Sequence, residues 1–295
     1  MSSVNVYYFI TKLKKMQGGS RLPAVAVKEK ICYNRVNKGV NMRKKKGFAA
    51  VGVIIGLVVL AVIGVATALV IDGNNKATNF DSYNFYSVIA PDDHNGQIGD
   101  HVKGEADAQV LVFEYADYQC PGCASLNPRV NQAVEELDGK LGVVYRNHLL
   151  SYHQNGTAAA SAAEAAGLQG YWKSYADVLF SNQSEWEYAS GSERTALFEK
   201  YFTQVTDGKG DLEKFRQDIA SDKVSKKISF DMGIGKRIEI PGTPAFFVDG
   251  QYIDWSKKEG GKLTINGKEI AWDHNLTGAE FVQLMKDIVA AKTGA

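Results

Sequence analysis

The sequence contains little cysteine and little proline, with three and six residues among 295. So few cysteines exclude a small disulfide-stapled scaffold, which needs them in closely spaced sets. The rest of the composition, 45% hydrophobic and 23% charged residues with 29 glycines, is ordinary for a globular chain. It excludes a disordered or collagen-like chain, and the length allows one large domain or two modest ones.

The net charge is only +1, but the two ends of the chain carry opposite charge. Residues 1–78 hold 13 Lys and Arg against 2 Asp and Glu, whereas residues 79–295 hold 21 against 31. An acidic body argues against nucleic-acid binding by that part of the chain. The opposite signs indicate that the two ends occupy different environments.

A long apolar run dominates the N-terminal part. Residues 48–71 are 24 consecutive uncharged residues, directly preceded by four basic residues at 43–46. As a helix this run would reach about 36 Å, enough to cross a hydrocarbon core of about 30 Å. We predict a single-pass anchor over 48–71 after a basic cytoplasmic tail over 1–47, with the remaining chain on the extracytoplasmic side of the cell membrane.

A cleaved signal peptide is the alternative to this signal anchor. Ala66-Thr67-Ala68 has the small-x-small pattern of a cleavage site. The apolar run exceeds the roughly 7–15 residues of a signal-peptide core, which favours a retained anchor. Met42 begins a typical start for an anchored protein, so residues 1–41 are either a cytoplasmic tail or the product of a mis-assigned start.

The body reads as an α/β domain over 101–295, joined to the anchor by a polar linker over 72–100. The continuous apolar strand after residue 108 is typical of a central strand covered on both faces. The predicted elements are a strand over 108–117, a helix from 121 to about 137, a strand over 141–147, a helical insertion over about 156–237, a strand from 244, a hairpin turning at Asn266-Gly267 and a helix over 278–291.

The only cysteines of the body, Cys120 and Cys123, come shortly after the first strand and are separated by two residues. A disulfide closing so small a loop stabilises weakly, and a zinc site would need a second pair of ligands. With Pro121 at the first helical position, Cys120 would lie at the positive end of a helix, which stabilises a thiolate. Cys123, one turn along, would face inward. The pair therefore predicts redox chemistry, with a Cu(I)-binding thiol module as the alternative.

The stretch EYADYQCPGC at 114–123 resembles the active-site signature of thioredoxin-fold proteins, most closely the DsbA-like disulfide oxidoreductases. IPGTPAFFVDG at 240–250 resembles the cis-proline loop and following strand of that family. Residues 146–172 resemble the start of its helical insertion, and residues 179–183 resemble the continuation. The resemblance covers roughly 102–289 and implies a thioredoxin fold with a helical insertion.

The resemblance also implies roles for single residues. Cys120 matches the nucleophile and Cys123 the resolving cysteine, while Pro244 matches the proline that follows a cis peptide bond, with Thr243 facing the sulfurs. Glu114 matches a buried carboxylate that could move a proton to or from Cys123; a solvent-facing Glu114 is the alternative. This chemistry requires neither a metal nor an organic cofactor.

The implied function is oxidation of cysteines in exported proteins, with reoxidation by a membrane partner that is DsbB-like or related to vitamin-K epoxide reductase. Pro121-Gly122 departs from the Pro-His pattern of DsbA, which leaves the oxidising strength open. A reductase or isomerase of the same fold is therefore an alternative. We expect His101, His148 and His153 to be surface or packing residues.

Overall fold

The structure is a computed structural model that describes residues 78–254, 260–272 and 278–294. The chain divides into two compact units after residue 75, and the second unit is the one described here. The predicted tail and anchor over 1–71 lie outside the described residues. Among the helices of the three described segments, none combines the length and hydrophobicity needed to cross a membrane.

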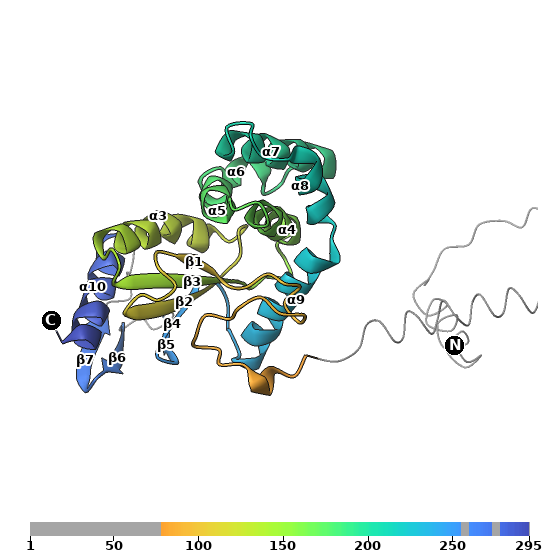
Figure 1. The fold of residues 1–295 in the computed structure, drawn as a ribbon. Coiled ribbons are helices and arrows are strands. Elements are labelled where there is room, and N and C mark those ends of the chain that lie inside the picture. The colour runs from red at the N-terminus through yellow and green to blue at the C-terminus, as the bar shows by residue number, and fades with distance from the viewer. Residues whose placement is uncertain (1–77, 255–259, 273–277, 295) are drawn as a thin grey trace, which may run out of the picture. The chain divides into compact units, whose positions relative to one another are not determined.

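The described unit alternates strands and helices around one central sheet (Figure 1). Its elements in chain order are the 3-10 helix η1 (Phe80–Ser82), β1 (His101–Lys103), β2 (Val110–Ala116), α3 (Pro121–Glu136), β3 (Leu141–Asn147), α4 (Gly156–Gly167), α5 (Trp172–Ser181), α6 (Gln183–Trp186), α7 (Gly191–Val205), α8 (Leu212–Ile219), α9 (Asp222–Arg237), β4 (Ala245–Val248), β5 (Gln251–Ile253), β6 (Gly261–Ile265), β7 (Lys268–Trp272) and α10 (Ala279–Thr293).

The five-stranded sheet has the order β1-β3-β2-β4-β5. Strands β2 and β3 run parallel, with α3 as their crossover, and the other pairs are antiparallel. Strands β6 and β7 form a separate hairpin, as predicted. Its turn places Asn266 at φ 49° and Gly267 at φ 80°, a conformation that these two residue types adopt readily.

Alternate side chains of β2 point to opposite faces of the sheet, and each face is covered. Val110 and Val112 belong to a core that includes α3 and α10, whereas Phe113 and Tyr115 belong to a core that includes α9. This is why the strand reads as a continuous apolar run rather than as an alternating one. By the same alternation Glu114 faces the α3 side, beneath the helix that begins at the cysteine pair.

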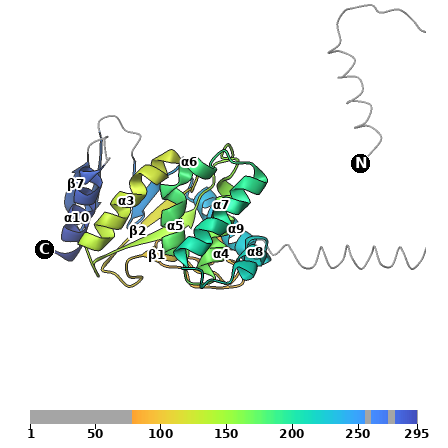
Figure 2. The same cartoon turned by 90° about the horizontal axis from the view of Figure 1, so that it is seen from above.

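Helices α4 to α8 form a helical subdomain that lies beyond one end of the sheet (Figures 1 and 2). Their aromatic residues make a core of their own, in which the rings of Phe202 and Phe215 stack with centroids 4.2 Å apart. This core also includes Tyr118, Tyr145 and Cys123. The insertion therefore packs directly against the end of the sheet at which the cysteines lie.

The residues before the sheet form an extended arm, here defined as residues 78–100, that packs on the domain. Ile89 and Ile98 of the arm are buried, and two of its main-chain carbonyls accept hydrogen bonds from Arg146 of β3. The sequence pattern predicted a polar linker over 72–100 and did not indicate this packing. The structure also adds β1, which is too short to show a pattern.

Candidate active site

The two cysteines lie where β2 passes into α3. Cys120 is the N-cap residue of α3 and Pro121 occupies the first helical position, as predicted. Proline is well tolerated there because that position has no intrahelical acceptor for an N–H. Cys120 is 7% exposed, and Cys123 is fully buried one turn along. Both are free thiols, with Cys120 nearer the surface and Cys123 behind it.

The surroundings of the two sulfurs move their pKa values in opposite directions. The pKa of Cys120 is lowered to about 5, chiefly because the Cys123 thiol donates a hydrogen bond to its sulfur. Thr243 and the N–H groups of Gly122 and Cys123 contribute further. Burial raises the pKa of Cys123 well above its usual value. At neutral pH Cys120 is therefore a thiolate and Cys123 a thiol, which suits a nucleophile and its resolving partner.

The loop before β4 brings Thr243 against Cys120. The Thr243–Pro244 peptide bond is cis, as the resemblance implies, and the Cys120 sulfur lies 3.2 Å from the Thr243 carbonyl oxygen, to which it donates when protonated. The buried Thr243 hydroxyl has no other partner among the described residues and is available to the Cys120 sulfur. A Cβ at position 122 would lie 3.1 Å from Cδ of Pro244. Gly122 thus permits the close approach of loop and helix.

Glu114 lies on β2 with 1% of its surface exposed, which excludes the solvent-facing alternative. Burial raises the pKa of its carboxyl to about 6, against an opposing effect of Lys103. Its charge in turn contributes to the raised pKa of Cys123. A carboxyl with a pKa near neutrality and electrostatic contact with a thiol is suited to exchange a proton with it. That role in the reaction stays a prediction.

Lys103 and Asp177 complete this polar site, and sequence reasoning missed both. Lys103 on β1 is 1% exposed; its Nζ donates to Asn127 Oδ1 of α3 and lies 3.7 Å from Asp177 Oδ1 of α5. Asn127 and Asn131 donate to the same Asp177 oxygen, at 3.0 and 2.8 Å. Burial lowers the pKa of Lys103. A lysine in a three-residue strand gives no periodic signal of burial.

The three histidines are partly buried, in keeping with the surface or packing role expected of them, and two of them also pair with carboxylates. His153 Nδ1 lies 2.8 Å from Asp117 Oδ2, and His101 Nε2 lies 2.7 Å from Glu164 Oε2. Both carboxylates are fully buried. His148 has no such carboxylate partner among the described residues; burial lowers its pKa.

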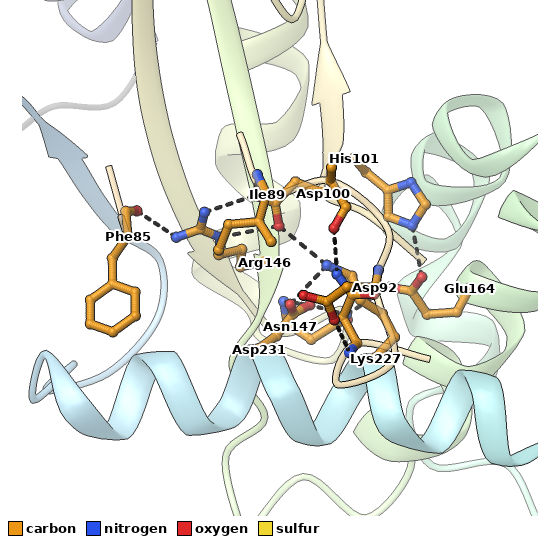
Figure 3. Close-up of polar contacts among 12 residues, drawn as sticks. Phe85, Ile89, Asp92, Asp100, His101, Arg146, Asn147, Glu164, Lys227 and Asp231 are labelled. Carbon is orange, nitrogen blue, oxygen red and sulfur yellow. Dashed lines mark hydrogen bonds and ion pairs between the residues drawn. The ribbon is translucent and has the colours of Figure 1, made fainter. Parts of the chain in front are cut away.

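A larger cluster of buried charges joins the arm to β3, α4 and α9 (Figure 3). Arg146 donates to both oxygens of Asp100, at 2.7 and 3.2 Å. Lys227 lies 2.8 Å from Asp231 and 3.3 Å from Asp100. Each of these charges has a partner of opposite sign, as buried charges require. The cluster fixes the arm to the sheet without touching the sulfurs.

The metal-binding alternative depends on the sulfurs alone. In residues 78–254, 260–272 and 278–294 there is no group of three or more His, Cys, Asp or Glu side chains that could hold a metal ion. A soft ion such as Cu(I) would therefore have Cys120 and Cys123 as its thiolate ligands.

The strand order, the cysteine pair at the start of α3 and the cis-proline loop beside it define a thioredoxin-like fold. The chain belongs to the thioredoxin family: the family model described as Thioredoxin matches residues 97–274. Family, fold and the paired cysteines together support thiol–disulfide oxidoreductase activity in general.

Curated relatives match only part of the chain. The Na(+)/H(+) antiporter NhaA 3 of Salinispora tropica is 33% identical over 52% of this chain and 22% of its own length. NhaA 1 of Salinispora arenicola gives the same values. The chain thus spans about a fifth of these relatives, and the antiporter name belongs to them.

Two solved structures are similar to this chain. BdbD of Bacillus subtilis is 16% identical, with 72% of this chain and 100% of that chain covered and a TM-score of 0.50. Alpha-DsbA1 of Wolbachia pipientis is 20% identical, with 66% and 93% covered and a TM-score of 0.47. At this identity the likeness to BdbD bears on the fold alone.

Proposed function

We propose that the protein oxidises cysteines of exported proteins through a Cys120–Cys123 disulfide. The observation that carries the proposal is the placement of the pair: Cys120 caps the N-terminus of α3 beside the Thr243 loop, and Cys123 is fully buried behind it. This asymmetry lowers the pKa of Cys120 to about 5 and raises that of Cys123. A stabilised thiolate favours the reduced enzyme, and this makes the corresponding disulfide a strong oxidant.

The reaction is thiol–disulfide exchange in two steps. A substrate thiolate attacks the Cys120 sulfur, the Cys120–Cys123 bond breaks, and Cys123 leaves and takes up a proton, for which Glu114 is the donor. A second substrate thiolate then attacks the substrate sulfur of the mixed disulfide and expels the Cys120 thiolate. The substrate loses two electrons and the enzyme gains them. The low pKa of Cys120 makes it a good leaving group.

The loop at Thr243 supports recognition of an extended substrate segment. Its carbonyl already lies within hydrogen-bond distance of the Cys120 sulfur. A substrate strand whose cysteine reaches that sulfur would therefore run beside the main chain of this loop and could pair with it. Such pairing depends on the substrate backbone and suits an enzyme that acts on many sequences.

We place the catalytic domain on the extracytoplasmic side, anchored through residues 48–71 with the N-terminus in the cytoplasm. The uncharged run and the four basic residues before it support this placement. Disulfides persist on that side of the membrane. Each turnover leaves the enzyme reduced, so we propose a membrane partner, DsbB-like or related to vitamin-K epoxide reductase, that reoxidises it.

The reduction potential of the Cys120–Cys123 pair in graded glutathione buffers tests the direction of electron flow. The proposal predicts a value near the −120 mV of a strong oxidase, and a value near −270 mV would make the protein a reductase. A protein that forms no reversible disulfide but binds Cu(I) one to one would be a metal module. Cys120→Ser, which cannot form the disulfide, is the matched control.

A further inference from the structure

Asp117 directly follows β2 and begins the turn that leads to Cys120. Its carboxylate is fully buried. Oδ1 accepts the N–H of Gln119 at 2.8 Å. Oδ2 accepts the N–H of Leu150 at 2.9 Å and lies 2.8 Å from Nδ1 of His153. The main-chain carbonyl of Asp117 accepts the N–H of Cys120 at 3.0 Å. Asp117 therefore accepts hydrogen bonds from the turn, from the loop after β3 and from the main-chain N–H of Cys120.

The turn held by Asp117 is also tied to the helical insertion. The Gln119 side chain accepts the N–H of Asn155 at 2.7 Å and donates to the carbonyl of Glu187 at 2.8 Å. Asn155 donates to the carbonyls of Trp186 and Ala189 at 2.9 and 3.1 Å. The residues before Cys120 are thus fixed from two sides.

The Asp117 carboxylate packs closely against the main chain at the start of α4. A Cβ at Gly156, the first residue of α4, would lie 2.9 Å from Oδ1, closer than such atoms normally approach. The main-chain N–H of Asp117 also faces the Cys123 sulfur. A shift of Asp117 would therefore disturb the surroundings of both sulfurs.

We propose that the Asp117–His153 pair is a positioning device for the redox site: it fixes the turn between β2 and α3 and thereby the alignment of the Cys120 sulfur with its hydrogen-bond donors. The inference rests on the proposed function. Neither side chain touches the reacting atoms, and both act through the main chain of 117–120. Removing the His153 donor leaves a buried carboxylate with one partner fewer, which favours a rearranged turn.

The test compares His153→Ala and Asp117→Asn with the wild-type protein in two measurements, the reduction potential and the pH at which the Cys120 thiol is half titrated. A misaligned thiolate is less stabilised, so the reduced form loses stability and the disulfide becomes less oxidising. We expect a tenfold change in the equilibrium constant with glutathione, about 30 mV toward negative values. The Cys120 titration should move upward by about one pH unit. His153→Asn, whose amide can place a donor near the position of Nδ1, should restore most of both.

His101→Ala is the matched control, because His101 also pairs with a buried carboxylate, Glu164 at 2.7 Å (Figure 3). That carboxylate belongs to α4 and not to the turn before Cys120, and the His101 ring stacks on Trp172. It should destabilise the protein while keeping the equilibrium constant within threefold of wild type. Wild-type values in both His153→Ala and Asp117→Asn would overturn the inference, as would an equal shift in His101→Ala. A wild-type protein without a reversible disulfide would refute the proposed function, while the Cys120 titration would still decide the role of Asp117 and His153.

Discussion

The pKa of about 5 at Cys120 predicts an unusual pH profile for its alkylation by iodoacetamide. The thiolate is the reacting species. With this pKa about 90% of Cys120 is thiolate at pH 6 and nearly all of it at pH 8. The alkylation rate should therefore change by only about 10% between these two pH values. An ordinary thiol of pKa about 8.5 would react about 75-fold faster at pH 8 than at pH 6. Because each ratio compares the rates of one thiol at two pH values, the intrinsic nucleophilicity of that thiol cancels.

The assay follows modification of the reduced protein by mass spectrometry between pH 4 and 9. Cys120→Ser provides the background, since the fully buried Cys123 with its raised pKa should react slowly throughout. Cys123→Ala removes the principal donor to the Cys120 sulfur and should move the midpoint upward. A wild-type midpoint above pH 7 would refute the assignment of Cys120 as a stabilised thiolate.

The same pKa shift predicts how the stability of the reduced protein depends on pH. The pKa of Cys120 is lower in the folded than in the unfolded chain, so its thiolate stabilises the fold fully above about pH 9. The contribution is lost as the pH falls toward 5. At pH 7 we expect about 1–2 kcal/mol after allowance for solvent screening. Urea unfolding of the reduced and oxidised proteins should therefore show a stability difference that changes between pH 5 and 8.

Three further variants test the buried charges. Glu114→Gln removes a carboxyl whose pKa is raised to about 6, so its ionisation costs stability as the pH rises from 4.5 to 6; the variant should exceed wild type by about 2 kcal/mol at pH 7 and match it at pH 4 in urea unfolding. Its resolving step should slow by about 100-fold, as measured by rapid mixing with a model disulfide. Lys103→Met removes the charge that opposes the raised pKa of Glu114, so the inflection of the resolving-step pH profile should move above pH 6; an unmoved inflection would separate Lys103 from the site. Asp100→Asn leaves Arg146 without its carboxylate and should cost about 3–5 kcal/mol in the same unfolding assay; a loss below 1 kcal/mol would show that the cluster does not hold the arm.

The features that the sequence predicted depend on neighbours along the chain. The strand over 141–147 is found with those bounds, and the helix that contains Cys123 begins at Pro121. The hairpin at Asn266-Gly267 depends on two residues that adopt a positive φ readily. The cysteine pair and the Thr243-Pro244 segment were assigned by motif resemblance, and the structure brings them into contact.

What the sequence did not indicate depends on partners that are distant in the chain. β1 is only three residues long and exists because His101 to Lys103 pair with β3 about forty residues later. Lys103 is acceptable in the interior only because Asn127 and Asp177, from two different helices, meet its ammonium group. A charged residue predicts an exposed position until its partner is known.

The insertion contributes to the redox chemistry as well as to the size of the domain. Asp177 of α5 supplies a carboxylate near Lys103, and Lys103 opposes the raised pKa of Glu114 behind Cys123. At the front of the site, the loop after α6 supplies the carbonyl that holds the Gln119 side chain next to Cys120. Both sulfurs therefore depend on contacts from the helical insertion. Cys123 is affected through the charges of Asp177, Lys103 and Glu114, and Cys120 through the position of the main chain at Gln119. It follows that a substitution in the insertion can shift the reduction potential without touching either cysteine.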